Sequence, residues 1–347
     1  MFPLLGRYLL DNWTEVLPGT STPDRLSFVQ LPGSRVSTFL ILGGRRDAGD
    51  RRPLLAVKIP RSRAGEDYLR LEYQNLERLA ARWGHLPGFL ASVPRPISLV
   101  AIGGKTILIL EGIPGSRLHT FPARGLRALD RACRWLTELQ AAALTRSSLS
   151  AEEVESMFLD PIRKFAKGSE LSPAARHYLR RLEDRARGVA GGKFPFTLTH
   201  GDVSVSNILL DRPVDGRGLD HASVSVIGWT KSLDAGLPLR DLWHLLTAYA
   251  KALTPQASSG RIVYCLRGPG AYAKTVRRWL DDYCERLSLP RWMQGLCIAF
   301  EYIYDGAFDD PWGIETTRQA RYQENFEVFV QGIGTTDEDR PFALLAD

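Results

Sequence analysis

Three polar residues that lie close together in the chain have side chains suited to catalysis: His200, Asp202 and Asn207. An imidazole and a carboxylate can exchange protons with a substrate, and carboxylate and amide oxygens can bind divalent cations. The same residue types are common in turns, where Asp202 would bond to local backbone amides and His200 would pack beneath it. The segment therefore indicates either a reactive loop or a tight turn.

Lys58 is a second candidate, because it lies in the apolar run from Leu55 to Ile59. A lone lysine is most often a solvated side chain on an edge strand. Here Val57 and Ile59 flank it, which favours a strand inside the protein over one at the surface.

The elements that position these residues change in kind along the chain. Up to Gly115, short β-like runs alternate with turns around one segment of helical spacing at 67–81. Beyond it most segments have helical spacing, and Ser150 with Glu153 forms a capping-box pattern. A β-rich stretch at 197–229 interrupts these helices and contains the polar segment. The expected strands are 37–42, 54–59, 97–102 and 106–110, and the expected helices include 126–140, 239–250, 271–287, 291–304 and 315–330.

With Asn207 five positions after Asp202 and an apolar strand behind it, His200-Gly201-Asp202 resembles the catalytic loop of the aminoglycoside phosphotransferase and choline kinase-like superfamily, relatives of the protein kinases. The resemblance spans roughly Pro32 to Leu246. It implies an α+β, bilobal protein-kinase-like fold with a small β-rich N-lobe and a larger, mostly helical C-lobe. Residues 1–111 would form the nucleotide-binding N-lobe, a sheet with one helix, and residues 112–347 the C-lobe with the catalytic loop and the acceptor site.

The resemblance also implies roles for the residues of the loop. Asp202 would be the catalytic base that accepts a proton from the acceptor hydroxyl, and Asn207 would bind magnesium. His200 would support the loop, as would Asp241 in the later segment Gly236-Leu237-Pro238-Leu239-Arg240-Asp241-Leu242.

In the N-lobe, the resemblance implies that Lys58 contacts the α- and β-phosphates of ATP or GTP. Its partner would be Glu72, with Glu66 and Glu77 as competing candidates, and Glu77 would otherwise belong to a solvated helix face.

Two further N-lobe segments resemble nucleotide-binding elements less specifically. The segment from Leu108 to Gly115, with Glu111, resembles the hinge whose backbone binds adenine, and it is equally compatible with a strand that ends in a Pro-Gly turn. The segment from Leu31 to Thr38 would cover the phosphates and contact them through Ser34, and a plain hairpin turn explains it as well.

The superfamily pattern breaks at Gly228, in Ile227-Gly228-Trp229. The superfamily has an aspartate here, which binds the magnesium ion that bridges the β- and γ-phosphates. Glycine supplies no ligand, and Asp234 is the nearest carboxylate that could replace it.

Two functions are compatible with this pattern. The first is that of an aminoglycoside phosphotransferase-like protein that phosphorylates a hydroxyl group of a small molecule with ATP or GTP, at a weakened or rearranged Mg²⁺ site. The second is that of a pseudokinase that binds a ligand or a partner protein, or uses the fold for chemistry other than phosphoryl transfer. An engineered inactive variant of a kinase would show the same pattern. Lys58, Glu72, Asp202 and Asn207 together favour the first function.

The acceptor of such a reaction would lie against the C-terminal helices, where acidic and aromatic residues alternate. Carboxylates beside aromatic rings suit a cationic or polyhydroxylated ligand, such as a small molecule or a peptide with a free hydroxyl. The alternative is a helix end with solvated acids and core aromatics. The candidate acceptor-binding residues are Glu301, Asp305, Asp309 and Trp312.

Composition places these motifs in an ordinary globular protein. The chain has 347 residues with 44% hydrophobic and 24% charged residues, which is enough for two lobes. Its net charge of +6 comes without a long basic block, so nucleic-acid binding is not expected. No run of apolar residues is long enough for a membrane span and no signal peptide is evident, so we expect a cytoplasmic protein. The oligomeric state is left open.

Overall fold

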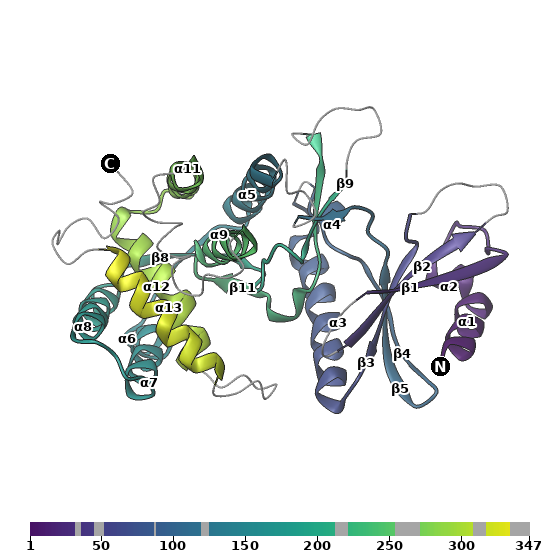
Figure 1. Ribbon diagram of the computed structural model, residues 1–347, viewed down its shortest axis with the longest axis horizontal. Helices are drawn as coiled ribbons and strands as arrows, with labels where there is room; N and C mark the ends of the chain where they lie inside the picture. Colours follow the sequence, from purple (N-terminus) through teal and green to yellow (C-terminus); the bar gives the residue numbers. More distant parts are fainter. Residues whose placement is uncertain are drawn as a thin grey trace. The chain divides into compact units, whose positions relative to one another are not determined.

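A computed structural model describes residues 1–31, 36–44, 52–86, 88–118, 125–211, 221–253, 271–307 and 317–333. The chain forms two compact units (Figure 1). Unit 1 comprises Met1–Phe121 and Ser206–Ser232, and unit 2 comprises Pro122–Val205 and Leu233–Asp347. Unit 1 is built on an antiparallel sheet and unit 2 is mostly helical, which confirms the predicted α+β fold class. The division into lobes at Glu111 stays a prediction.

The main sheet of unit 1 has five antiparallel strands in the order β1-β2-β3-β5-β4. Val57 of β3 is opposite Ile109 of β5, and Lys58 is opposite Leu108, so the expected strands around Lys58 are central in the sheet. The strands are β1 (Arg25–Leu31), β2 (Val36–Gly44), β3 (Leu55–Pro60), β4 (Pro96–Ile102) and β5 (Lys105–Glu111).

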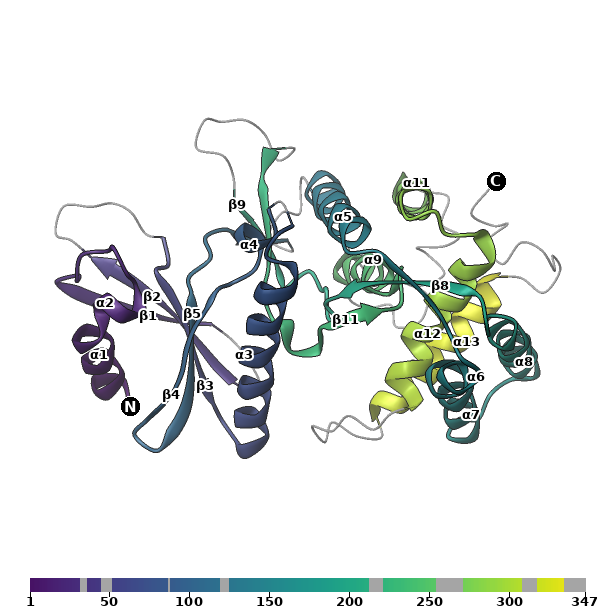
Figure 2. The same ribbon diagram turned by 180° about the vertical axis from the view of Figure 1, so that it is seen from behind.

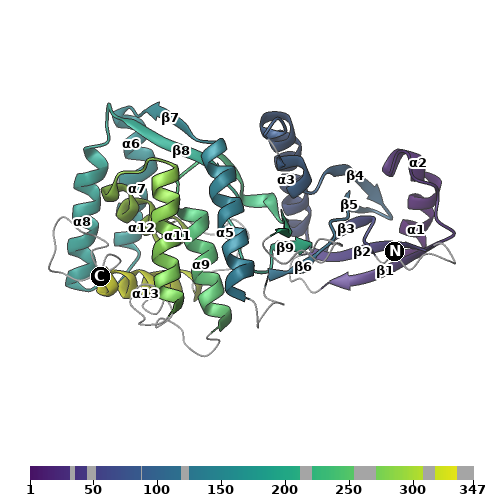
Figure 3. The same cartoon turned by 90° about the horizontal axis from the view of Figure 1, so that it is seen from above.

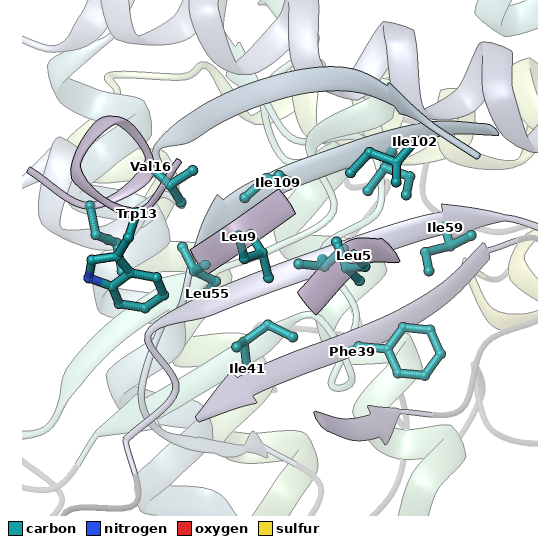
Figure 4. Packing of buried hydrophobic residues seen from close by; sticks show 13 residues of the cluster. Leu5, Leu9, Trp13, Val16, Phe39, Ile41, Leu55, Ile59, Ile102 and Ile109 are labelled. Carbon is teal, nitrogen blue, oxygen red and sulfur yellow. The ribbon is translucent and has the colours of Figure 1, made fainter. Parts of the chain in front are cut away.

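Helices cover both faces of this sheet (Figure 1). On one face, α1 (Phe2–Asp11) and α2 (Trp13–Val16) bury apolar side chains such as Leu9 against Leu55 and Val57 (Figure 4). On the other face lies α3 (Arg63–Trp83), capped by the Ser62 side chain. Because side chains alternate along a strand, Val57 faces α1 while Lys58 faces α3.

A second, three-stranded sheet completes unit 1, in the order β10-β9-β6. Its strands are β6 (Ser116–Arg117), β9 (Ile208–Asp211) and β10 (Ser223–Val226), and the short helix α4 (Phe89–Ser92) packs against β10. Asn207 immediately precedes β9, and Gly228 lies between β10 and the 3₁₀ turn η5 (Trp229–Lys231). The antiparallel pairing of β9 with β10 thus brings these two residues together.

In unit 2, α12 packs against α7, α9 and α13, and α5 packs against α9 and α11 (Figures 2 and 3). This unit also contains a three-stranded sheet in the order β11-β8-β7. Its central strand, β8, ends at Thr199, just before His200. The capping box of Ser150 and Glu153 is present at the start of α6. The elements are α5 (Gly125–Ala142), β7 (Thr145–Ser148), α6 (Ala151–Val154), the π-helical turn η3 (Glu155–Leu159), α7 (Asp160–Lys167), α8 (Pro173–Arg187), β8 (Lys193–Thr199), β11 (Leu233–Gly236), α9 (Arg240–Leu253), α11 (Ala271–Arg286), α12 (Arg291–Ala307) and α13 (Thr317–Ile333).

In the part of the chain that the structure describes, none of the helices is long and apolar enough to cross a bilayer.

Candidate functional site

Lys58 and Glu72 form a buried ion pair in unit 1. The Lys58 ammonium nitrogen lies 2.6 Å from Glu72 Oε1 and 2.7 Å from Oε2, and the Glu72 side chain is fully buried. Of the three glutamates considered for this position, the structure therefore brings Glu72 to Lys58, while Glu77 accepts a hydrogen bond from Tyr73 on the exposed face of α3. Removing one member of such a pair would leave an uncompensated buried charge, so the pair holds the ammonium group in place.

The same face of α3 also holds the segment that follows Gly228. Asn75, one turn beyond Glu72, donates hydrogen bonds to the backbone oxygens of Trp229 (3.0 Å) and Thr230 (2.8 Å). Arg78, one turn further, donates to the backbone oxygen of Ser232 (3.0 Å). Sequence reasoning missed both residues, although the spacing of three between Glu72, Asn75 and Arg78 was a signal that they share one helix face.

Gly228 has a left-handed backbone, with φ +86°, and lies against the side chain of Asn207. A Cβ atom built on it would lie 3.5 to 3.6 Å from the Asn207 amide group, which is ordinary van der Waals contact. The backbone amide of Ile227 donates to the Asn207 carbonyl oxygen at 2.9 Å. A side chain at position 228 would therefore start beside Asn207.

The donors at these positions do not fit a magnesium site of the expected kind. Magnesium beside nucleotide phosphates is usually bound through one or two carboxylates. Asn207 offers an amide oxygen, whereas Gly228 offers no side-chain ligand. Among the described residues, no group of three His, Cys, Asp or Glu residues is placed to hold a metal ion. Asp234 lies half-buried in β11, in unit 2, and its role as a substitute ligand stays a prediction.

In unit 2, the buried carboxylate of Asp241 anchors the loop that carries Asp202. It accepts hydrogen bonds from the backbone amides of His200 (2.7 Å) and Gly201 (2.9 Å). The Gln140 amide donates to it at 3.0 Å, and Gln140 in turn accepts from the hydroxyl of Tyr283 at 2.6 Å. Burial raises the pKa of Asp241 to about 6, against the opposing effect of the two backbone amides.

His200 is buried, and its Nδ1 accepts a hydrogen bond from the backbone amide of Asp202 at 3.1 Å. Gly201 between them has φ +79°, a value that a residue with a side chain rarely adopts. The loop backbone is thus held from two sides, while the Asp202 side chain stays 43% exposed.

The structure adds a residue that sequence reasoning missed, His244 of α9. Its Nε2 lies 3.5 Å from Asp202 Oδ1, and its Nδ1 lies 2.6 Å from Glu301 Oε1. Arg240 donates to the other oxygen of Glu301 at 2.9 Å. A single histidine in a helix carries no sequence signal of its own, and its spacing of three from Asp241 was the one available sign that it lies near the loop.

Of the predicted acceptor-binding residues, Glu301 is nearly fully buried in α12, where His244 and Arg240 engage both of its oxygens. Asp305 belongs to α12, but its side chain is outside the described part, as are Asp309 and Trp312.

The predicted nucleotide-contacting segments are placed only in part. Glu111 ends β5, donates its backbone amide to the Arg95 carbonyl oxygen at 2.9 Å, and has its exposed carboxylate 3.6 Å from Arg95 Nε. The Gly112 amide donates to the Leu54 carbonyl oxygen at 2.9 Å. Ser34 lies outside the described residues.

Comparison with known proteins identifies the fold and the family. The model of the phosphotransferase enzyme family matches residues 36–283. A search of curated proteins finds no significant match. Among solved structures, a thermostable mutant of aminoglycoside phosphotransferase APH(4)-Ia with ADP and hygromycin B is 12% identical, with 95% of this chain and 99% of that chain covered and a TM-score of 0.55.

Two further solved structures are similar. A putative fructosamine-3-kinase from Thermobifida fusca is 16% identical over 93% of this chain and 97% of that chain, with a TM-score of 0.50. A choline/ethanolamine kinase family protein from Mesorhizobium loti is 15% identical over 99% of both chains, with a TM-score of 0.46. The family match and the similarity to the APH(4)-Ia structure confirm the predicted resemblance and the kinase-like fold, and the chain belongs to the phosphotransferase enzyme family.

Proposed function

We propose that this protein transfers the γ-phosphoryl group of ATP or GTP to a hydroxyl group of a small molecule or peptide. The observation that carries the proposal is the setting of Asp202. The backbone of its loop is fixed by the buried Asp241, while its own carboxylate remains accessible. A general base must be reachable by its substrate, and the Asp202 side chain is 43% exposed.

In the proposed reaction, Asp202 accepts the proton of the acceptor hydroxyl as the acceptor oxygen attacks the γ-phosphorus. A new oxygen–phosphorus bond forms, the bond to the β–γ bridging oxygen breaks, and the nucleoside diphosphate leaves with the electron pair. Lys58, held by Glu72, offsets the negative charge of the α- and β-phosphates. Positioning and charge compensation supply most of the catalysis in reactions of this class.

The nucleotide base would lie against the end of β5 near Glu111, and Ser34 would contact the phosphates. Support for a nucleoside triphosphate comes from the family match and from the ADP complex of the similar aminoglycoside phosphotransferase. We infer no catalytic step through magnesium, because Gly228 contributes no side-chain ligand beside Asn207.

Gly228 favours a second candidate function, that of a pseudokinase that binds a ligand or partner without phosphoryl transfer. The buried Lys58–Glu72 pair and the anchored Asp202 loop favour the enzyme, because a binding protein has no evident need for both.

Asp202 provides the test of the proposed function. The full-length protein is mixed with ATP or GTP and a panel of hydroxylated acceptors, and release of the nucleoside diphosphate is measured. Asp202→Ala should lower turnover by about 10²-fold or more, because a general base contributes a factor of this size. The variant should still fold, because the side chain is 43% exposed.

Nucleotide binding separates the two candidate functions. For an enzyme, ATP should raise the melting temperature of the wild type by mass action, and magnesium should increase the shift. An ATP-induced shift in melting temperature that is the same with and without magnesium, together with no diphosphate release with any acceptor, would support the pseudokinase. Turnover that is unchanged in Asp202→Ala would remove Asp202 from its proposed role.

A further inference from the structure

We propose that His244 is a positioning residue for Asp202, a cation that orients the carboxylate for the acceptor hydroxyl. This inference deepens the proposed function and rests on it, because it takes Asp202 as the base. His244 belongs to none of the motifs that resemble the family.

The contact belongs to a row of four side chains of alternating charge, all in unit 2: Asp202, His244, Glu301 and Arg240. The distances along the row are 3.5, 2.6 and 2.9 Å. The exposed fraction of the side chains falls from 43% at Asp202 through 27% at His244 to 7% at Glu301. The row therefore starts at an accessible carboxylate and ends at a buried ion pair.

The chemistry of the two neighbours determines the protonation of the imidazole. An ionised carboxylate only accepts hydrogen bonds, so the nitrogen facing Glu301 must carry a hydrogen. The nitrogen facing Asp202 must carry one for the same reason. With both nitrogens protonated, His244 is an imidazolium.

The charges around His244 agree with this state. Burial by itself lowers the pKa of His244, but Glu301 and Asp202 outweigh it and raise the pKa to about 10. Of the other charged groups nearby, Arg240 lies beyond Glu301 and Asp241 is bonded to the loop amides. From α12, Tyr304 lies under the Arg240 guanidinium at 5.6 Å.

The loop does not need His244 as an anchor. Asp241 already holds the backbone amides of His200 and Gly201, and His200 holds that of Asp202. These bonds fix the loop backbone, whereas His244 reaches the carboxylate itself. This contact acts on the rotation of the Asp202 side chain, on which in-line proton transfer depends.

The test compares three variants of the full-length protein with the best acceptor from the panel. His244→Gln keeps a hydrogen-bond donor without the charge and should lower kcat by about 10²-fold with little change in KM, because misplacement of a base by about 1 Å has an effect of this size. His244→Lys keeps the charge and should recover about tenfold of that loss. His177→Gln, on the exposed surface of α8, is the matched control and should equal the wild type.

The pH profile separates this role from a merely structural one. With the cation removed, the acid limb of kcat should move to higher pH in His244→Gln, because a nearby positive charge favours an ionised carboxylate. A kcat within threefold of wild type and an unmoved acid limb would overturn the proposal.

A second measurement does not depend on turnover. In ¹⁵N NMR spectra, the His244 ring should remain an imidazolium up to about pH 9 in the wild type, and Asp202→Asn and Glu301→Gln should each lower its midpoint. If no acceptor is phosphorylated and this signature is present, the contact stands and the proposed function fails. A His244 ring that titrates near pH 6.5 in the wild type overturns the inference, whatever the activity. Because this measurement uses the wild type, it tests the inference even if His244→Gln does not fold.

Discussion

Gly228 is the residue at which the sequence predicts a departure from the family pattern, and several hydrogen bonds hold the chain around it. The backbone on either side is held by the Ile227 amide, by the Trp229 indole, which donates to the Val226 carbonyl oxygen at 2.8 Å, and by Asn75. The left-handed conformation of Gly228 is one that aspartate and asparagine tolerate better than most residues. A carboxylate at this position therefore has room beside Asn207, although the left-handed backbone strains any side chain there.

We predict that Gly228→Asp gains magnesium-dependent ATP turnover of about 10²-fold, because the new carboxylate lies beside Asn207 and restores several kcal/mol of charge stabilisation. Diphosphate release with and without magnesium measures the gain. Gly228→Asn has the same shape without the charge and should gain nothing. Equal gains in both variants, or a wild type with ordinary kinase rates, would show that Gly228 is not the defect.

Among the elements of unit 1, α3 holds both Lys58 and the segment after Gly228. One face of this helix carries Glu72, Asn75 and Arg78, which bind Lys58 of β3 and the backbone from Trp229 to Ser232. Since these contacts are on one rigid helix, the position of the Lys58 ammonium group and that of the segment after Gly228 are coupled.

We predict that Asn75→Ala destabilises the protein by about 1–3 kcal/mol, because it leaves two buried backbone oxygens without their donor. Nucleotide binding should weaken as well, since the segment beside Asn207 loses its attachment to α3. Chemical denaturation and the ATP-induced shift in melting temperature measure the two effects. Gln74→Ala, on the exposed side of the same helix, should show neither, and similar losses in both variants would argue against the coupling.

For the molecule as a whole, two titratable groups near the Asp202 loop, Asp241 and His244, should contribute to how stability varies with pH. The pKa of Asp241 is raised from 3.8 to about 6, and that of His244 from 6.5 to about 10. Between pH 3.8 and 6 for Asp241, and between pH 6.5 and 10 for His244, the native state binds a proton that the unfolded state has lost. Stability therefore falls as pH rises through these two ranges.

The expected result is that the melting temperature of the wild type falls between pH 6.5 and 9.5 by more than that of His244→Gln. The variant lacks the group that takes up the proton in this range, so the difference between the two proteins should shrink as pH rises. Parallel curves for the two proteins would mean that His244 is not charged in the native state.

The pattern of residue types was sufficient to predict the fold class and the family. Alternating apolar runs around Lys58, helical spacing beyond Gly115, and His200-Gly201-Asp202 with Asn207 are local signals, because strand and helix periods act over a few residues. The pairing of Glu72 with Lys58 was predicted because both lie in recognisable segments, although their roles in catalysis remain to be tested.

The contacts of His244, Asn75 and Gln140 depended on the packing of whole elements. His244 lies 42 positions from Asp202, and Asn75 lies 154 positions from Trp229, so no local period relates them. Whether a histidine in a helix meets a carboxylate or solvent is decided by how α9 and α12 pack against the loop. Local sequence thus predicts each helix and strand, whereas the charged groups around Asp202 come together only when these elements pack against one another.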